Sequence, residues 1–148
     1  MSTAARALSV MFVAAFGLSF ASRGKADGAP FQASLSCQPA AGPGRILCEL
    51  TTRAVEGKLV WSDALVVRAP AFVRPLRSRF AARLREAEGS GGAWAKLALV
   101  ASEAGEGKLE LLARGVICHE GPAGEWCAPV QAPVTVEIHV GSANTKQP

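Results

Sequence analysis

Four cysteines are the residues of this chain that most directly offer chemistry, and they come in two pairs. Ten residues separate Cys37 from Cys48, and eight separate Cys118 from Cys127. Two cysteines that lie close along a chain can form a disulfide, which either stabilises the fold or exchanges with the thiols of a partner protein. The second pair encloses an insert that contains Gly and Pro, and Pro129 follows shortly after it.

The spacing of the cysteines does not match a zinc site. Structural zinc sites usually place paired cysteines about two to four residues apart, whereas eight and ten residues intervene here. His119, next to Cys118, is the one additional ligand nearby, and a solvated histidine in a turn explains it more simply. No metal is therefore expected.

Other catalytic residues are sparse. The chain has no Tyr, its histidines are His119 and His139, and Asp63 is the only Asp after Asp27. A Ser-His-Asp triad would need one of these histidines, of which one falls in a turn and the other points outward on a late strand. No Gly-rich phosphate loop and no paired carboxylates stand out. Hydrolase or transferase activity and a cofactor are not expected; an enzymatic role would be that of a thiol-disulfide oxidoreductase.

The start of the chain has the layout of a secretory signal peptide. Arg6 precedes an apolar run at residues 7–21, and small residues then precede two candidate cleavage points, before Asp27 or, as the less favoured choice, before Ser22. An uncleaved membrane anchor is the alternative. It is disfavoured because Arg23 interrupts the run before the roughly 20 apolar residues that a membrane-spanning helix needs.

We divide the chain into a signal peptide, residues 1–26, and one domain, residues 27–148. The full chain has a net charge of +4, and the signal peptide contains three bases and no acid, so cleavage lowers the net charge to +1. This small charge argues against a nucleic-acid partner, and no stable membrane insertion is expected after cleavage. Four cysteines in an exported chain of this size indicate two disulfides and a periplasmic or extracellular location.

Apolar residues recur at every second position along the domain, between turns rich in Gly and Pro, which is typical of β-strands. The run at residues 58–67 is apolar on both faces and indicates a central strand, with Trp61 in the core. The pattern predicts an all-β fold, a single immunoglobulin-like antiparallel β-sandwich of about seven strands. We expect these strands near residues 31–37, 46–50, 58–67, 76–84, 95–99, 109–117 and 134–140.

Residues 75–88 support two interpretations. In a helix, Pro75 would lie in the first turn, and Leu76, Phe80 and Leu84 would share one face. In a strand, which the all-β context slightly favours, the same three residues would point inward and arginines would form a basic outer face. That face would be either an ordinary solvated surface or a binding patch for an anionic surface such as lipid headgroups or polysaccharide. The arginines are Arg77, Arg79, Arg83 and Arg85.

Two disulfide pairings are open. The local pairing joins Cys37 to Cys48 and Cys118 to Cys127. The crossed pairing joins Cys48 to Cys118; with Trp61 thirteen positions after Cys48, it resembles the Cys…Trp…Cys arrangement of immunoglobulin domains. Alternation places Cys118 off the apolar face of its strand, which favours the local pairing.

The stretch GKLELLARGVICHEGPAGEWCAPVQAPVTVEIHV, residues 107–140, contains a strand, a cysteine, a short insert, a Cys-x-Pro motif and a final alternating strand. It resembles the end of the N-terminal immunoglobulin-like domain of thiol:disulfide interchange reductases of the DsbD type. In that family the two cysteines carry electrons in the periplasm to partner oxidoreductases. The resemblance implies that Cys118 and Cys127 are a redox pair, that Pro129 occupies the family's proline position, and that a thioredoxin-like oxidoreductase is the partner.

Two functions follow from these observations. The favoured one is a disulfide-stabilised binding or structural module, whose partner would be a protein or an envelope ligand of unknown identity. In that case Cys118 and Cys127 form a structural disulfide, because Glu120 and Glu125 beside them would raise the thiol pKa and disfavour the thiolate that exchange requires. The alternative is a periplasmic electron-transfer domain that uses Cys118 and Cys127.

Overall fold

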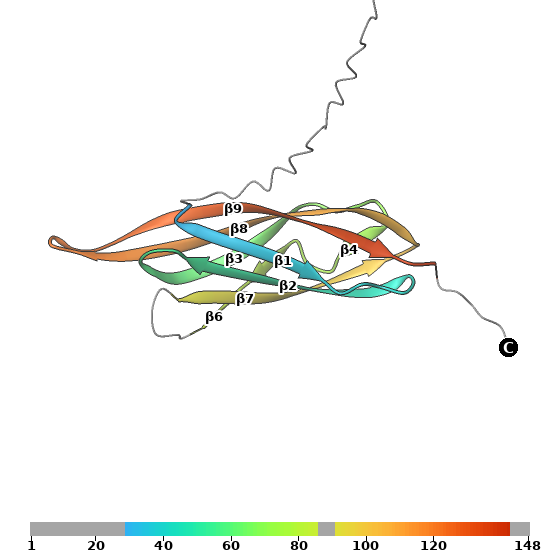
Figure 1. The fold of residues 1–148 in the computed structure, drawn as a ribbon, viewed down its shortest axis with the longest axis horizontal. Helices are drawn as coiled ribbons and strands as arrows, with labels where there is room; N and C mark the ends of the chain where they lie inside the picture. Colours follow the sequence, from blue (N-terminus) through green and yellow to red (C-terminus); the bar gives the residue numbers. More distant parts are fainter. Residues whose placement is uncertain (1–28, 86–90, 143–148) are drawn as a thin grey trace, which may run out of the picture.

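The structure, a computed structural model, describes residues 29–85 and 91–142. Two antiparallel sheets lie face to face as a β-sandwich (Figure 1), which confirms the predicted all-β fold. The described ranges contain no α-helix, and hence no helix long and apolar enough to cross a membrane. The expected signal peptide, residues 1–26, lies outside the described residues, so its cleavage stays a prediction.

Within these ranges the chain forms nine strands, more than the seven expected, because the segment after Pro70 makes three short strands instead of one. Sheet A has the order β1-β2-β7-β4, with β6 also paired to β7; sheet B has the order β5-β3-β8-β9. The strands are β1 (Phe31–Cys37), β2 (Gly44–Ala54), β3 (Lys58–Arg68), β4 (Val73–Pro75), β5 (Arg79–Ala81), β6 (Arg83–Arg85), β7 (Gly92–Ala101), β8 (Gly105–Gly121) and β9 (Gly124–Val140).

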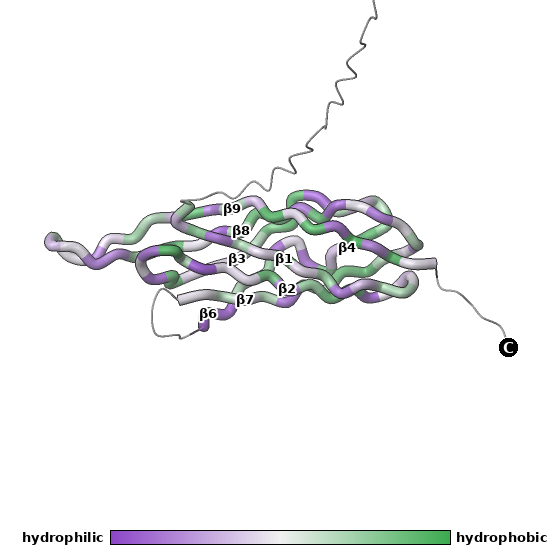
Figure 2. The backbone as a smooth tube through the Cα atoms, in the orientation of Figure 1, coloured by the Kyte–Doolittle hydropathy of each residue, from purple (hydrophilic) through white to green (hydrophobic). Residues whose placement is uncertain are grey.

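The inner faces of the two sheets form one hydrophobic core, because apolar residues alternate with polar ones along the long strands. In β2, Ile46 and Leu50 are buried while Arg45 is exposed, and Figure 2 shows similar changes of colour along the neighbouring strands. One polar contact crosses the core, where the buried hydroxyl groups of Thr52 and Ser62 lie 3.0 Å apart. Alternation therefore decides which side chains reach the two outer faces.

Strand β3 departs from simple alternation, which changes the position of Trp61. Leu59 faces the core, but the register against β8 shifts between Leu59 and Trp61, as in a β-bulge. After the shift Ser62 and Ala64 point inward, and Trp61 lies on the outer face with 40% of its surface exposed. The prediction of a core tryptophan is wrong, because a bulge adds a residue that the sequence pattern does not mark.

Residues 73–85 cross from sheet A to sheet B and back. Strand β4 pairs with β7, β5 pairs with β3, and β6 pairs with β7 again. The segment is therefore extended and not helical, but it is not one continuous strand. Of the apolar residues expected to point inward, Phe80 is buried, whereas Leu76 and Leu84 are exposed.

The hairpin of β8 and β9 is the longest element, with 17 residues in each strand. Strand β3 follows β8 only as far as Cys118, which pairs with Lys58, so the end of the hairpin projects from the sandwich, at the left of Figure 1. Gly124 beside the turn has a φ of 105°, a conformation that residues with a side chain rarely adopt. Pro129 and Pro133 in the edge strand β9 lack backbone donors, which discourages pairing with a further strand.

Candidate functional site

Both disulfides join cysteines that stand directly opposite each other on neighbouring strands. Cys37 of β1 is bonded to Cys48 of β2, and Cys118 of β8 is bonded to Cys127 of β9. This is the local pairing, and the crossed pairing of Cys48 with Cys118 is absent. Each of the two bonds ties strands of one sheet together, so the contact between the sheets depends on the hydrophobic core.

The Cys118–Cys127 bond lies near the surface, where the hairpin begins to project. Cys118 is buried but Cys127 is exposed, so a partner thiol would reach the sulfur of Cys127 first. A carboxylate oxygen of Glu125 lies within 4.8 Å of both sulfur atoms, and Glu120 stands opposite Glu125. The two carboxylates disfavour a thiolate at this place. Because each sulfur is bonded to the other, neither is the thiolate that binds metals, and the group is not a metal site in the oxidised protein.

His119, the neighbour of Cys118, is used for packing. Its ring stacks on Trp126 with 4.4 Å between ring centres and 18° between ring planes. The ring also covers Gly57, where a Cβ atom would lie 2.8 Å from ring atoms of His119. Since successive residues of a strand point to opposite sides, the ring faces away from the Cys118 side chain. His119 therefore holds the hairpin against the turn between β2 and β3.

The remaining catalytic candidates are not brought together. His139 of β9 has its Nδ1 atom 3.2 Å from a carboxylate oxygen of Glu106, whereas Asp63 of β3 lies between Arg79 and Arg114. These partners are carboxylates and guanidinium groups and not a nucleophile. The geometry therefore gives no support to a Ser-His-Asp mechanism.

Asp63 is the centre of a buried ion-pair cluster on the outer side of sheet B. Arg114 donates from Nε to Oδ1 at 2.8 Å and from Nη2 to Oδ2 at 2.6 Å, and Arg79 donates from Nε to Oδ2 at 2.6 Å. Burial alone would raise the pKa of Asp63, but the hydrogen bonds and charges of Arg114 and Arg79 outweigh burial and lower that pKa below its usual value. The sequence analysis missed this cluster; a lone Asp in an otherwise apolar strand was its only local signal.

The outer face of sheet A is strongly basic. Alternation turns every second residue of β2 and β7 outward, and β4 and β6 place further arginines beside β7. Glu49 is the one acid that the described strands add to this surface, and no ion pair joins its bases to an acid within residues 29–85 and 91–142. We call this surface the basic face; its bases are Arg45, Arg53, Arg74, Arg83, Arg85 and Lys96.

Trp94 lies within the basic face. Its neighbours across the sheet are Arg83 of β6 and Thr51 of β2. The guanidinium group of Arg85 and the ammonium group of Lys96 lie 5.9 and 5.7 Å from the centre of its ring, which is within the range of cation–π interactions. The indole is half-buried, so part of the ring and the flanking charges are open to a ligand.

Residues 73–85, which cross from sheet A to sheet B and back, are called the crossing segment. Two hollows lie beside Lys96, where this segment leaves sheet A. Strand β4 pairs with residues 99–101 of β7 and β6 with residues 92–94, so residues 95–98 have no strand beside them here. We call this opening the β7 gap. One hollow measures about 280 Å³ and is lined by Leu76, Arg77, Phe80, Ala81, Lys96 and Ala98. The other measures about 290 Å³ and is lined by Ala81, Arg83, Trp94, Ala95 and Lys96.

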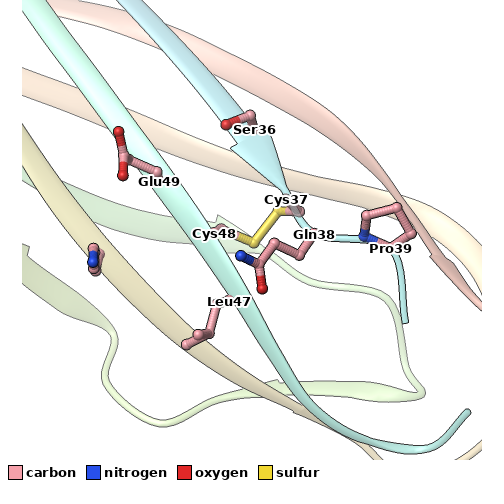
Figure 3. Close-up of a pocket in the computed structure, with 8 residues that line it drawn as sticks. Ser36, Cys37, Gln38, Pro39, Leu47, Cys48 and Glu49 are labelled. Atoms are coloured by element: carbon pink, nitrogen blue, oxygen red, sulfur yellow. A yellow bond between two sulfur atoms is a disulfide. The ribbon is translucent and has the colours of Figure 1, made fainter. Parts of the chain in front are cut away.

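A third hollow opens on the other side of Lys96, over β1 and β2 (Figure 3). Its volume is about 440 Å³, and its lining residues include Cys37 of β1 and Cys48 of β2. Ser36, Gln38 and Glu49 supply polar groups around it. Lys96 lines all three hollows, so a row of recesses crosses the basic face at this residue.

The four arginines that the sequence grouped together do not form one surface. Arg83 and Arg85 belong to the basic face, Arg77 lines a hollow beside it, and Arg79 is bound to Asp63 on sheet B. Consecutive short strands of the crossing segment join different sheets, which separates them. The other bases of the face come from β2, β4 and β7, and only strand pairing brings these distant segments together.

Comparison of the sequence with known protein families finds no match, and no curated protein matches it either. The resemblance of residues 107–140 to DsbD-type domains therefore stays a hypothesis.

Proposed function

We propose that this protein is an exported binding module, a disulfide-stabilised β-sandwich whose basic face binds an anionic ligand of the cell envelope. The separation of charge is the observation that supports this proposal. Among the described residues, six bases and one acid point out of sheet A, although removal of the expected signal peptide lowers the net charge from +4 to +1. On sheet B, acids such as Glu110, Glu120 and Glu125 balance the bases. An anion therefore meets one attractive face.

Gathering bases on one face has a cost in stability, because like charges on the same side of a sheet repel one another over roughly the 8 Å range of exposed charges in salt. Arg53 and Arg85 flank Gly92 from its two sides, and Arg45 and Arg74 stand in the same relation at the other end of β7. A bound anion would relieve this repulsion. We therefore expect an anionic ligand to raise the melting temperature by binding the folded state.

Two triple variants with equal changes of charge test the proposal. The variant of the basic face carries Arg53→Gln, Arg83→Gln and Lys96→Gln. The control variant changes three bases of sheet B: Lys58→Gln, Arg68→Gln and Lys108→Gln. Binding is measured to an acidic polysaccharide and to anionic vesicles at about 0.15 M salt, where exposed charges act over roughly 8 Å.

The basic-face variant should lose about a hundredfold in affinity, because each base contributes roughly 1 kcal/mol at an anionic surface. The control variant should bind nearly as well as the natural protein. The proposal fails if the natural protein binds neither probe, or if both variants lose the same affinity. Circular dichroism of each variant shows whether the fold is kept.

A thiol-disulfide electron carrier is the second candidate. The exposure of Cys127 on a projecting hairpin supports it, together with the resemblance of residues 107–140 to DsbD-type domains. In this reaction a thiolate of a thioredoxin-like partner attacks the sulfur of Cys127 and forms a mixed disulfide with it, while Cys118 leaves as a thiolate that takes a proton from water. A second thiolate of the partner then attacks the partner's sulfur in the mixed disulfide, which oxidises the partner to a disulfide and releases Cys127 as a thiol. The carboxylates of Glu120 and Glu125 oppose the approach of the partner's attacking thiolate.

The reduction potential of this pair separates the two candidates. A structural disulfide in an exported protein usually has a potential below about −300 mV. Glutathione buffers near −200 mV should therefore leave Cys118 bonded to Cys127, as peptide mapping without reductant would show. Equilibration with such a buffer, together with exchange with a thioredoxin-like protein while the Cys37–Cys48 bond stays oxidised, would establish the electron carrier instead.

A further inference from the structure

We infer that the ligand of the basic face is a carboxylated glycan, a chain of hydroxylated rings with acid groups, whose rings lie along β7 and occupy the β7 gap. This inference rests on the proposed function and adds the class of ligand and the part of the face that recognises it. Four features of the gap support it: its walls, the half-buried indole of Trp94, the backbone groups that no described strand pairs with, and the position of the exposed apolar residues.

The walls of the gap combine charge with apolar surface. Arg77 and Lys96 lie in the same hollow as Leu76 and Phe80. A sugar ring with a carboxylate presents the same combination, since its C–H groups are apolar and its acid group pairs with cations. Binding sites for small groups are concave and mostly apolar, with a few polar groups that fix orientation. A purely electrostatic surface would gain nothing from such recesses.

Trp94 offers a flat ring next to cations. The adjacent hollow is lined by Trp94, Arg83 and Lys96 together, and adjacent strands stand about 4.8 Å apart. A sugar that packs its C–H face on the indole can therefore place a carboxylate beside a neighbouring guanidinium or ammonium group. Arg83 is suited to this role because a guanidinium group can bind both oxygens of a carboxylate.

Backbone groups of β7 also face the gap. Leu76 donates its N–H to the carbonyl oxygen of Ala98 at 3.1 Å. Backbone groups two residues apart in a strand point to the same side, so the N–H and C=O groups of Lys96 face this side as well. Strands β4 and β6 do not reach Lys96. No strand of the described ranges therefore pairs with the N–H and C=O groups of Lys96 on this side. The hydroxyl groups of a sugar, which donate and accept hydrogen bonds, can pair with both groups.

The exposed apolar residues do not favour a membrane as the ligand. Proteins that bind a bilayer surface commonly insert apolar side chains among the headgroups. Trp61 and Val67 are exposed but lie on β3, and Trp126 lies on the projecting hairpin. Leu84 is exposed on β6, but it alternates with Arg83 and Arg85 and therefore points to the other side of the strand. Leu76 is the exposed apolar residue among those described that borders the hollows of the basic face. An anionic bilayer is therefore the competing outcome of the test.

The test compares four probes at about 0.15 M salt. Polygalacturonate is the carboxylated glycan, dextran is a neutral glycan, polyglutamate has carboxylates without sugars, and phosphatidylglycerol vesicles represent the membrane. Calorimetry on the natural sequence gives the affinities. Tryptophan fluorescence of a Trp61→Phe, Trp126→Phe variant reports on Trp94 alone. We expect polygalacturonate to bind at least about tenfold more tightly than polyglutamate and to change the Trp94 emission, and dextran not to bind.

Single variants locate the site within the basic face. Lys96→Gln and Arg83→Gln should each reduce the affinity for polygalacturonate by about tenfold, the loss that corresponds to one charge-assisted contact. Arg45→Gln is the matched control, because it removes the same charge from the same face near the other end of β7. It should reduce the affinity by less than about threefold.

The outcomes separate this inference from the proposed function. If none of the anionic probes binds, both fail. If polyglutamate or the vesicles bind as tightly as polygalacturonate, or if Arg45→Gln costs as much as Lys96→Gln, the basic face binds anions but the carboxylated-glycan inference is wrong. Binding of polygalacturonate without a change in Trp94 emission would also overturn it, since the rings would then not lie along β7.

Discussion

Arg79 and Arg83 are four residues apart in the chain, yet they lie on opposite faces of the sandwich. Arg79 of β5 donates to the buried carboxylate of Asp63 at 2.6 Å. Arg83 of β6 stands opposite Trp94 and forms no ion pair with an acid among the described residues. The crossing of the chain between the two sheets thus gives one arginine to a structural cluster and leaves the other on an open surface.

The difference between Arg79 and Arg83 shows that a nearby buried carboxylate decides whether an arginine has a structural role or stays available to a ligand. A buried carboxylate without a partner is costly, so its arginines become part of the fold. An exposed arginine without an acid contributes little to stability and keeps its charge available to a ligand. Sheet B therefore uses arginine to neutralise Asp63, and sheet A uses arginine to present charge.

The largest expected effect on stability comes from replacing Arg114, which donates hydrogen bonds to both carboxylate oxygens of Asp63. We expect Arg114→Met to lower the free energy of unfolding substantially, because it leaves a buried carboxylate with Arg79 as its one remaining ion-pair partner among the described residues. Arg83→Met on the basic face should change it by less than about 0.5 kcal/mol. Urea denaturation of both variants measures the difference, and equal effects would contradict the comparison of the two faces.

A double variant identifies the cause of that loss. If the cost comes from the carboxylate that is left behind, Asp63→Asn combined with Arg114→Met should be more stable than Arg114→Met alone. If the cost came only from lost packing of the Arg114 side chain, the second substitution would bring no recovery.

The long strands could be predicted from the sequence because each of them buries one face. Leu50, Leu97 and Leu109 are fully buried and lie in strands whose alternation is regular. The local disulfide pairing could be anticipated as well, since each pair of cysteines belongs to strands that are consecutive in the chain and pair as neighbours, such as Cys118 of β8 and Cys127 of β9.

Other features depend on contacts that alternation does not encode. The bulge in β3 reverses the direction of Trp61, and no residue type marks it. The crossing segment separates Arg79 from Arg83 because neighbouring short strands pair with different sheets. The basic face combines β2, β4, β6 and β7, so its existence follows from strand order. Local patterns can place a residue on one side of a strand, but they cannot say which strands share a sheet.

Acid should weaken the cluster on sheet B and leave the basic face unaffected. The pKa of Asp63 is lowered in the folded protein, whereas in the unfolded chain it is near about 3.9. The stabilisation that ionised Asp63 gives to the folded protein is therefore fully present above about pH 5. It is lost as the pH falls through the folded-state pKa of Asp63. The difference in unfolding free energy between the natural protein and Asp63→Asn should shrink on acidification. A difference that stays constant down to about pH 3 would contradict the lowered pKa.

The two outer tryptophans should differ in binding more than in stability. Trp61 is 40% exposed, with the guanidinium group of Arg114 5.8 Å from its ring centre, so Trp61→Ala should cost only about 1 kcal/mol. Trp94→Ala should cost a similar amount and, unlike Trp61→Ala, should weaken polygalacturonate binding. A loss of about 3 kcal/mol or more for Trp61→Ala, as is typical of a buried tryptophan, would mean that Trp61 lies in the core.

The smallest expected effect concerns the acids beside the Cys118–Cys127 disulfide. They make the end of the hairpin acidic, in contrast to the basic face of sheet A. Glu125 lies within 4.8 Å of the sulfurs of Cys118 and Cys127, and Glu120 stands opposite it. A charge about 7 Å from a carboxylate in water interacts with it by roughly 0.6 kcal/mol, which is about threefold in rate. The rate with cationic cysteamine divided by the rate with anionic 3-mercaptopropionate should therefore be larger for this disulfide than for a small uncharged disulfide, which serves as the reference because the two thiolates differ in intrinsic nucleophilicity.

Substitution of these acids tests the effect directly. Glu120→Gln with Glu125→Gln should bring the ratio of the two reduction rates close to the ratio for the uncharged reference disulfide, and Arg83→Gln, on the opposite sheet, should leave the ratio unchanged. Added salt should reduce the preference of the natural protein, because exposed charges are screened. A ratio that persists after both acids are replaced would show that the carboxylates do not control access to Cys127. A ratio that falls to the reference value would show that the carboxylates of the hairpin select the charge of the thiol that approaches Cys127.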